Sequence, residues 1–168
     1  MCIRDSNSID EVLAGHATDI SFQYKKDGSI KIKDNGRGIP IDFHPKYKNK
    51  RALEVVLTTL HAGGKFNSNA YKTSGGLHGV GISVVNALSS LLQVQVFKDG
   101  KVYRQDYSKG KVKTKIKIEK CSKKLKGTEI SFIPDKSIFE ETQFVPKKLY
   151  NFINTVSYTH LTLPTSSW

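Results

Sequence analysis

The sequence predicts an α+β fold, a two-layer sandwich in which helices cover one face of a mixed, mostly antiparallel sheet. Two short alternating segments joined by a turn stand near the N-terminus, and four more strand candidates follow one another after residue 92. Segments with helical apolar spacing lie between these two groups. Strands grouped apart from helices are typical of α+β domains, whereas regular alternation of strand and helix would favour a parallel sheet.

Local patterns assign each element. Alternation of apolar and polar residues predicts strands, and apolar residues three or four apart predict helices. Asp99-Gly100, between two strand candidates, is a strong hairpin signal. Gly15 is expected to end the first helix, because glycine is common just after a helix C-terminus. The expected helices are 7–14, 50–61, 77–92 and 146–154, and the expected strands are 18–25, 29–33, 93–98, 101–107, 111–119 and 128–133.

Size and composition exclude several classes of protein. The chain has 168 residues and a formal net charge of +12, and this length suits one domain with its own core. No apolar run approaches the ~20 residues that a membrane-spanning helix needs, so no membrane partner is expected. Cys2 and Cys121 are too few for a disulfide framework or a cysteine zinc cluster. A reducing cytoplasm is therefore the expected location.

The two ends are expected to derive from a DNA linker. Residues 1–5 can be encoded by a string whose reverse complement encodes Val-Ser-Tyr-Thr-His, and this pentapeptide occurs at Val156–His160. One linker translated in opposite directions accounts for both ends. The expected division is therefore a linker-derived segment over 1–6, a domain over 7–154 that is truncated at both ends, and a second linker-derived segment over 155–168.

Residues 74–88, SGGLHGVGISVVNAL, contain closely spaced glycines that lead directly into an apolar helix. Glycines let the backbone approach a ligand closely, and the first N–H groups of a helix attract anions. The segment is neither a Walker loop, since Gly64-Lys65 is followed by Phe66, nor a Rossmann motif, whose glycine order differs. A phosphate-binding loop of another kind is predicted.

Four motifs together resemble the ATPase domain of the B subunits of bacterial type II topoisomerases. They are NSIDE at 7–11, DNGRGIP at 34–40, HAGGKF at 61–66 and the glycine-rich segment at 75–88. The resemblance covers residues 7–154 and implies the GHKL (Bergerat) ATPase fold, which Hsp90 chaperones, mismatch-repair clamps and histidine kinases share. It implies ATP and Mg²⁺ as ligands. Residues 43–47 with 52–55, and residues 127–135 with 138–139, resemble the topoisomerase IV branch more than the gyrase branch.

The resemblance also implies roles for individual residues. Asn7 matches the magnesium ligand, Asp34 matches the carboxylate that accepts the adenine amino group, and Thr128 matches a second hydrogen-bonding partner behind the base. Taken alone, Asn7 would instead suggest a polar residue on a helix surface, and Asp34 would suggest a turn or a cap. Thr128 alone would suggest a residue that packs within a strand. The other implied ATP-binding residues are Gly36 and Gly38 at the base, Lys65 and Tyr71 in a lid, and Gly75, Gly76, Leu77, His78, Gly79, Val80, Gly81 and Ile82 around the triphosphate, with Arg37, Ile39 and Pro40 at the pocket rim.

In the intact family members, the resemblance implies that ATP binding closes two B subunits around a DNA duplex and that hydrolysis reopens them. The implied partners are double-stranded DNA, a second copy of the B subunit and a ParC- or GyrA-like A subunit, at the nucleoid in the cytoplasm. The first alternative is the gyrase branch. More distant alternatives are a chaperone or mismatch-repair clamp that uses the same pocket without strand passage, and a nucleotide-binding module without catalysis.

Positive charge is concentrated in residues 101–126, which hold eleven Lys and Arg residues and only two acids. Over 111–119 the lysines occupy odd positions, whereas Val112, Thr114, Ile116 and Ile118 occupy even ones. This alternation predicts a strand with one packed face and one row of lysines. The row has two interpretations, a solvated strand that resists edge-to-edge aggregation or an electrostatic footprint for duplex DNA.

The chain is expected to bind ATP and to hydrolyse it hardly at all. By the resemblance, the general base is a Glu one helical turn before Asn7, and that position is Ile3. A positioned base contributes about 10²- to 10⁴-fold to the rate of such a step. Phosphate release should therefore be far slower than for an intact family member, and comparable turnover would contradict the expectation.

Overall fold

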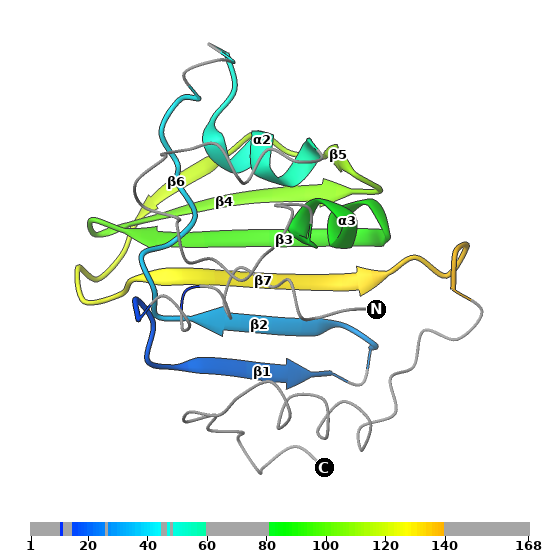
Figure 1. Cartoon of the computed structure of the whole chain (residues 1–168), viewed down its shortest axis with the longest axis horizontal. Helices are drawn as coiled ribbons and strands as arrows, with labels where there is room; N and C mark the ends of the chain where they lie inside the picture. Colours follow the sequence, from blue (N-terminus) through cyan, green and yellow to red (C-terminus); the bar gives the residue numbers. More distant parts are fainter. Residues whose placement is uncertain are drawn as a thin grey trace.

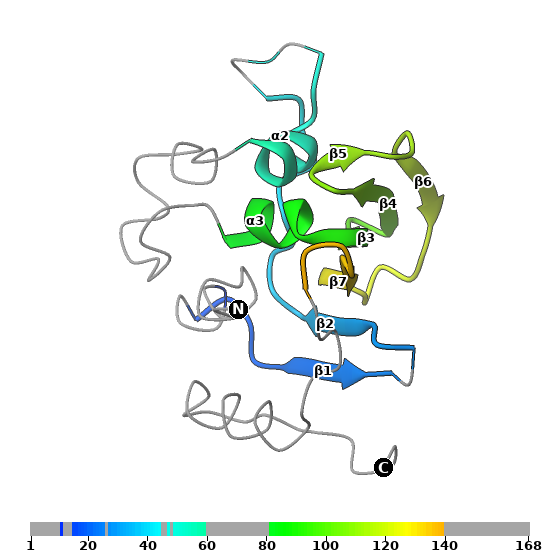
Figure 2. The same cartoon turned by 90° about the vertical axis from the view of Figure 1, so that its right-hand side faces the viewer.

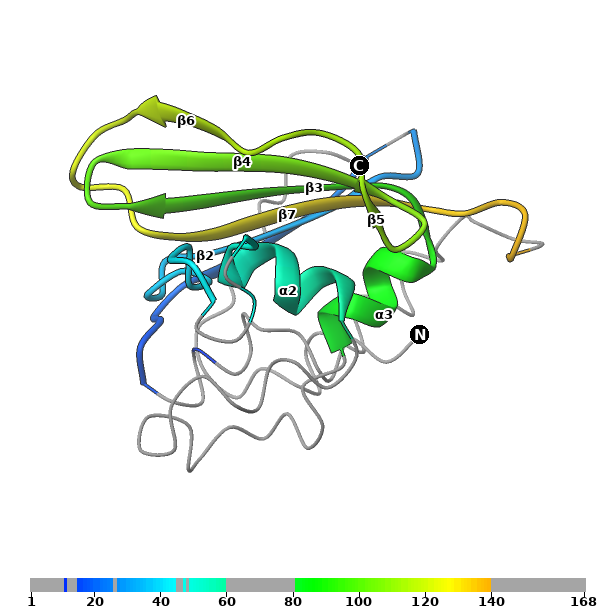
Figure 3. The same cartoon turned by 90° about the horizontal axis from the view of Figure 1, so that it is seen from above.

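The computed structural model describes residues 11, 15–25, 27–44, 47, 49–59 and 81–139. These residues form a seven-stranded sheet with two helices on one face, as Figures 1 and 3 show. The elements are β1 (Ile20–Tyr24), β2 (Ile30–Asp34), α2 (Ala52–Thr58), α3 (Gly81–Ala87), β3 (Ser89–Lys98), β4 (Lys101–Ser108), β5 (Lys111–Val112), β6 (Lys117–Lys120) and β7 (Gly127–Pro134). The predicted α+β sandwich is confirmed.

The strand order is β1-β2-β7-β3-β4, and both β5 and β6 pair with β4 at the far end of the sheet. Every pairing among the described strands is antiparallel. The last strand, β7, lies between β2 and β3 and so joins the two hairpins β1–β2 and β3–β4 into one sheet. This insertion places the end of β2 beside the beginning of β7, where Lys33 is paired with Glu129.

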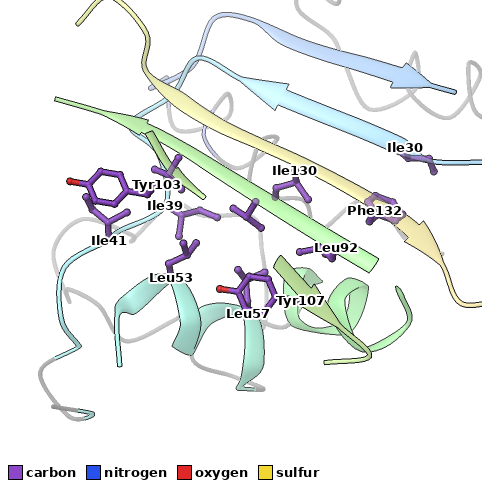
Figure 4. Close-up of a cluster of buried hydrophobic side chains, with 12 residues drawn as sticks. Ile30, Ile39, Ile41, Leu53, Leu57, Leu92, Tyr103, Tyr107, Ile130 and Phe132 are labelled. Carbon is purple, nitrogen blue, oxygen red and sulfur yellow. The ribbon is translucent and has the colours of Figure 1, made fainter. Parts of the chain in front are cut away.

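The hydrophobic core lies between the sheet and the two helices (Figure 4). Alternate residues of β3, Leu92, Val94 and Val96, are fully buried against this layer, and Leu53 and Leu57 of α2 meet them from the other side. On the opposite face Gln93 is exposed and Gln95 is half-buried, although Phe97 and Val102 on that face are buried. Alternation with period two places successive side chains of a strand on opposite faces, which explains the division.

Several expected elements are confirmed. The hairpin of β1 and β2 forms, and Asp99 and Gly100 turn the chain between β3 and β4 with positive φ of 53° and 72°. The expected helix at 50–61 is present as α2. Gly15 has a φ of +73°, and the N–H of His16 donates to the carbonyl of Glu11 over 2.8 Å, which is the geometry of a helix end. The helix expected at 146–154, and the domain boundaries at residues 7 and 154, lie outside the described residues.

The helix predicted over 77–92 is too long at its C-terminal end. α3 ends at Ala87, and β3 begins at Ser89, which is paired with Pro134 of β7. The Ser89 side chain donates to the carbonyl of Val85 over 2.6 Å and so occupies an acceptor at the helix end. An uninterrupted apolar run fits a buried helix or a buried strand equally well, so its period could not locate this boundary.

The single strand predicted over 111–119 is also wrong, because the segment forms β5 and β6 with a break between them. The N–H groups of Lys113 and Thr114 both donate to the carbonyl of Asp106, at 2.8 and 3.3 Å, and this local arrangement interrupts the strand. The predicted packed face forms only in part: Ile116 packs against the core and Thr114 is half-buried, whereas Val112 is 39% exposed and Ile118 is 48% exposed.

No helix among the described residues has the length and apolar character needed to cross a membrane.

Asp135, just after β7, generates a prediction for acid stability. Its carboxylate contacts the Lys109 ammonium at 2.9 Å and accepts the Ser137 N–H at 3.0 Å. The bond from Lys109, followed by those from Ser137, lowers the pKa of Asp135 from 3.8 to about 2. A carboxyl whose pKa is depressed by folding stabilises the fold above its unfolded-state pKa and loses that contribution as the pH falls through the folded-state value.

Asp135→Asn should therefore reduce the pH dependence of the free energy of unfolding between pH 3.8 and about 2. Urea denaturation at several pH values measures it. Asp99→Asn, in the exposed β3–β4 turn, is the matched control and should leave the dependence unchanged. An Asp135→Asn profile as steep as that of the original chain would contradict the prediction.

Candidate functional site

Asp34 is the centre of the site. It ends β2, is only 1% exposed, and its Oδ1 accepts the N–H of Gly36 at 3.0 Å and the N–H of Thr128 at 3.2 Å. One carboxylate oxygen thus holds both the loop that follows β2 and the first residues of β7. The two N–H donors fix the orientation of the carboxylate.

Thr128 completes the junction between β2 and β7. Its side chain is almost fully buried, and its Oγ1 accepts the N–H of Ile39 at 3.1 Å. The structure therefore brings Asp34 and Thr128 into direct contact, although 94 residues separate them in the sequence. This is the pair that the resemblance placed at the adenine base.

Glycines allow the close approach of backbone segments at this junction. Gly127 has a φ of +108°, and a Cβ on it would collide with the backbone carbonyl of Asp34. Gly38 has a φ of +79°, and a Cβ there would lie 2.9 Å from a methyl carbon of Val96. Residues with side chains rarely adopt such φ values, so both conformation and space require glycine. Sequence reasoning assigned no role to Gly127, because the contact that requires it is not local.

Buried Glu11 and Arg37, whose side chain is 38% exposed, form an ion pair beside Asp34. The Arg37 backbone N–H and Nε donate to Glu11 Oε2 at 3.0 and 3.2 Å, and its terminal nitrogen Nη2 donates to Oε1 at 2.9 Å. Burial by itself would raise the pKa of Glu11, but the hydrogen bonds and positive charge of Arg37 outweigh it and lower the pKa below its usual value. The pair fixes the loop to Glu11.

Arg37 was expected at the pocket rim, whereas Glu11 received no role. The only sequence signal for Glu11 was its position one turn after Asn7 in the NSIDE motif. Gly36 explains how closely the two segments approach, since a Cβ on it would lie 2.8 Å from Glu11 Oε2.

Asn35 anchors the other side of the loop. Its Oδ1 accepts the N–H groups of Thr18 and Asp19 at 2.9 and 3.1 Å, and its Nδ2 donates to both of their side chains. The loop after β2 is therefore held on one side by Asn35, on the other by Glu11 and underneath by Asp34. This is a rigid support, as recognition of a flat ligand requires.

The other predicted residues fall in different places. Gly81 and Ile82 begin α3, and Ile82 packs against the core. Ile39, expected at the rim, is 2% exposed and belongs to the hydrophobic core, and Pro40 beside it is half-buried. The described residues contain no cluster of His, Cys, Asp and Glu that could hold a metal ion. The predicted residues outside the described part are Ile3, Asn7, Lys65, Tyr71, Gly75, Gly76, Leu77, His78, Gly79 and Val80.

Comparison with known proteins identifies relatives of this arrangement. Residues 6–138 match the family described as histidine kinase-, DNA gyrase B- and HSP90-like ATPase. The DNA topoisomerase 4 B subunit of Rickettsia bellii is 56% identical over 153 residues, which are 90% of this chain and 23% of that protein. The DNA gyrase B subunit of Thermotoga maritima is 51% identical over 152 residues, 90% of this chain and 24% of that protein. The chain thus spans about a quarter of the length of these relatives.

Solved structures agree with the sequence relatives. The 43K ATPase domain of Thermus thermophilus gyrase B, in complex with an aminocoumarin, has a TM-score of 0.76 and 39% identity, covering 90% of this chain and 37% of that one. The topoisomerase IV ATP-binding domain of Francisella tularensis, in complex with a small-molecule inhibitor, has a TM-score of 0.74 and 42% identity, covering 89% and 39%. The chain has the fold of these ATPase domains.

Thr128→Val should lower the free energy of unfolding by about 1–3 kcal/mol, because it leaves the buried Ile39 N–H without its acceptor. Thr128→Ser is the control, since it keeps the hydroxyl and removes one methyl group, worth about 0.8 kcal/mol. Urea denaturation of the two variants measures the difference. Equal destabilisation of both would show that the hydroxyl contributes nothing.

Proposed function

Because the chain belongs to the family of histidine kinase-, DNA gyrase B- and HSP90-like ATPases, we propose that it is the ATP-binding domain of the B subunit of a type II topoisomerase. The observation that carries the proposal is the buried Asp34 carboxylate, held between the end of β2 and the start of β7 by two N–H groups. A carboxylate accepts hydrogen bonds and donates none when ionised. It therefore suits the exocyclic amino group of adenine.

The same chemistry supports discrimination between purines. Guanine carries a carbonyl oxygen where adenine carries its amino group, so two acceptors would face each other at Asp34. A buried acceptor without a donor is costly. ATP should thus bind in preference to GTP. Thr128, in contact with Asp34, is the second group at the base, and Gly36 and Gly38 keep side chains out of the slot.

The remaining assignments rest on the sequence motifs. Gly75 to Gly81 would surround the triphosphate, Lys65 and Tyr71 would close over it, and Asn7 would hold Mg²⁺ together with phosphate oxygens. The metal would neutralise phosphate charge, while Asp34 and Thr128 orient the base. These roles follow the family resemblance of the motifs.

For the longer protein we propose ATP-driven passage of one DNA duplex through another, with a second copy of itself and a topoisomerase A subunit as partners at the nucleoid. The named relatives are the B subunits of DNA topoisomerase 4 and of DNA gyrase. Identities of 56% with the former and 51% with the latter favour topoisomerase IV. Decatenation without negative supercoiling by the full-length enzyme would support this choice, and supercoiling would assign it to gyrase.

Asp34→Asn tests the proposal with little structural disturbance. Asparagine retains one oxygen to accept the Gly36 and Thr128 N–H groups and places an amide donor where the carboxylate has its second oxygen. A hydrogen bond to a charged group is worth about 1.5–3 kcal/mol, so affinity for a non-hydrolysable ATP analogue should fall at least about tenfold.

Calorimetry with Mg²⁺ and the analogue measures this affinity. Asp99→Asn is the matched control, because it makes the same chemical change at an exposed residue in the turn after β3. Unchanged affinity in Asp34→Asn, or an equal loss in both variants, would refute the role of Asp34. A failure of the original chain to bind would refute the proposed function.

A further inference from the structure

We propose that one end of the sheet binds the phosphate backbone of duplex DNA. This surface, the basic rim, comprises nine lysines of β4, β5, β6 and the segments that adjoin them: Lys101, Lys111, Lys113, Lys115, Lys117, Lys120, Lys123, Lys124 and Lys126. The inference rests on the proposed function in one respect, that DNA is the substrate of the longer protein. The nine lysines are distinct from the residues assigned to the nucleotide site.

β4, β5 and β6, which carry or adjoin six of these lysines, lie at the end of the sheet opposite β1 (Figure 2), and Lys123, Lys124 and Lys126 follow on the segment from β6 to the start of β7. β6 pairs with β4 so that Lys120 lies opposite Lys101, and β5 pairs with β4 so that Lys111 lies opposite Ser108. The N–H of Cys121 donates to the carbonyl of Gly100 at 2.9 Å, which draws the segment after β6 to the β3–β4 turn. Cations from separate parts of the sequence thus share one surface.

Like charges face each other directly within this rim. Lys101 is the pairing partner of both Lys98 and Lys120, and Arg104 is the partner of Lys117. Like charges directly opposite one another on neighbouring strands destabilise a sheet. Protection of an edge against aggregation requires only an occasional lysine. Repeated juxtaposition of cations is better explained by an anionic ligand that relieves the repulsion.

The rim charges have no acidic partners among the residues that the structure describes. All nine lysines are exposed, and none takes part in an ion pair there. Of the two acids in 101–126, Glu119 contacts Arg104 at 3.4 Å and Asp106 accepts from the Gln93 amide at 3.3 Å. The positive charge of the rim therefore remains available to a polyanion.

The break between β5 and β6 is rigidly held, which presents its lysines in a defined arrangement. Thr114 Oγ1 accepts the N–H of Asp106 at 3.0 Å, and the Thr114 carbonyl accepts the Gln105 amide at 3.2 Å. Gln105 is 4% exposed and also accepts the hydroxyl of buried Tyr107 at 2.8 Å. Thr114 therefore anchors the backbone between Lys113 and Lys115. Preorganisation reduces the entropy lost on binding.

Composition identifies the form of the nucleic acid. Residues 109–126 contain no aromatic residue. Proteins that bind single strands stack bases on aromatic side chains, whereas contacts to a duplex backbone need only cations. Duplex DNA is therefore the expected ligand.

The test compares two variants of equal net charge. In the rim variant, Lys113, Lys115 and Lys117 are replaced by Gln, and in the control variant Lys25, Lys50 and Lys136, which are exposed outside the rim, are replaced by Gln. Fluorescence anisotropy with a short mixed-sequence duplex, over a series of salt concentrations, gives the slope of log K against log salt. Each lost phosphate contact should reduce the slope by about 0.9, so the rim variant should lose roughly two to three units.

The control variant should retain most of the original slope. An equal loss in both variants would overturn the proposal, because net charge alone would then explain binding. Tighter binding of a single strand than of the duplex, or no duplex binding at low salt, would also overturn it. Binding of an ATP analogue, measured on the same samples, should be equal in all three proteins, and its absence from all of them would count against the proposed function instead.

Discussion

The geometry of the site depends on one buried carboxylate that joins two distant parts of the chain. Asp34 accepts N–H groups from Gly36, two residues on, and from Thr128 at the start of β7. This contact requires β7 to lie between β2 and β3, and Gly127 makes the approach possible because no side chain fits there. The topology of the sheet therefore positions Asp34 and Thr128, the proposed base-binding groups.

Beside Asp34, the cost of burying a charged side chain is offset by its hydrogen bonds to a group of opposite charge. Glu11 is 4% exposed, and a lone carboxylate at that depth would be unfavourable, but three hydrogen bonds from Arg37 compensate it. Removing Arg37 would leave the buried Glu11 charge uncompensated, and the bonds between the two residues hold the loop after β2 in place. Asn35 holds the same loop from the side of β1. A slot that is fixed before the ligand arrives loses little entropy on binding.

The two ends of the sheet serve different purposes in this interpretation. The β2–β7 junction is closely packed and buried, and its charged side chains have hydrogen-bonding partners. The end formed by β4, β5 and β6 is exposed and rich in lysines that have no acidic partner among the described residues. Ion pairs in the described part of the chain are sparse at that end, with Glu119 as the one acid that contacts a cation of β4. A nucleotide site and a polyanion surface can thus coexist in one small domain without shared residues.

The sequence by itself determined the features that depend on neighbouring residues: the two hairpins, α2, the helix end at Gly15 and the motifs that revealed the ATPase family. It could not locate the boundary between α3 and β3, because an apolar run fits either conformation, nor the break between β5 and β6, which arises from bonds between Asp106 and Thr114. The resemblance placed Asp34 and Thr128 at one site, but only the tertiary structure decided that Asp34 accepts the Thr128 N–H, that Glu11 meets Arg37 and that Gly127 must lack a side chain. These contacts join residues from 26 to 94 positions apart, and no local pattern records which distant residue completes a hydrogen bond.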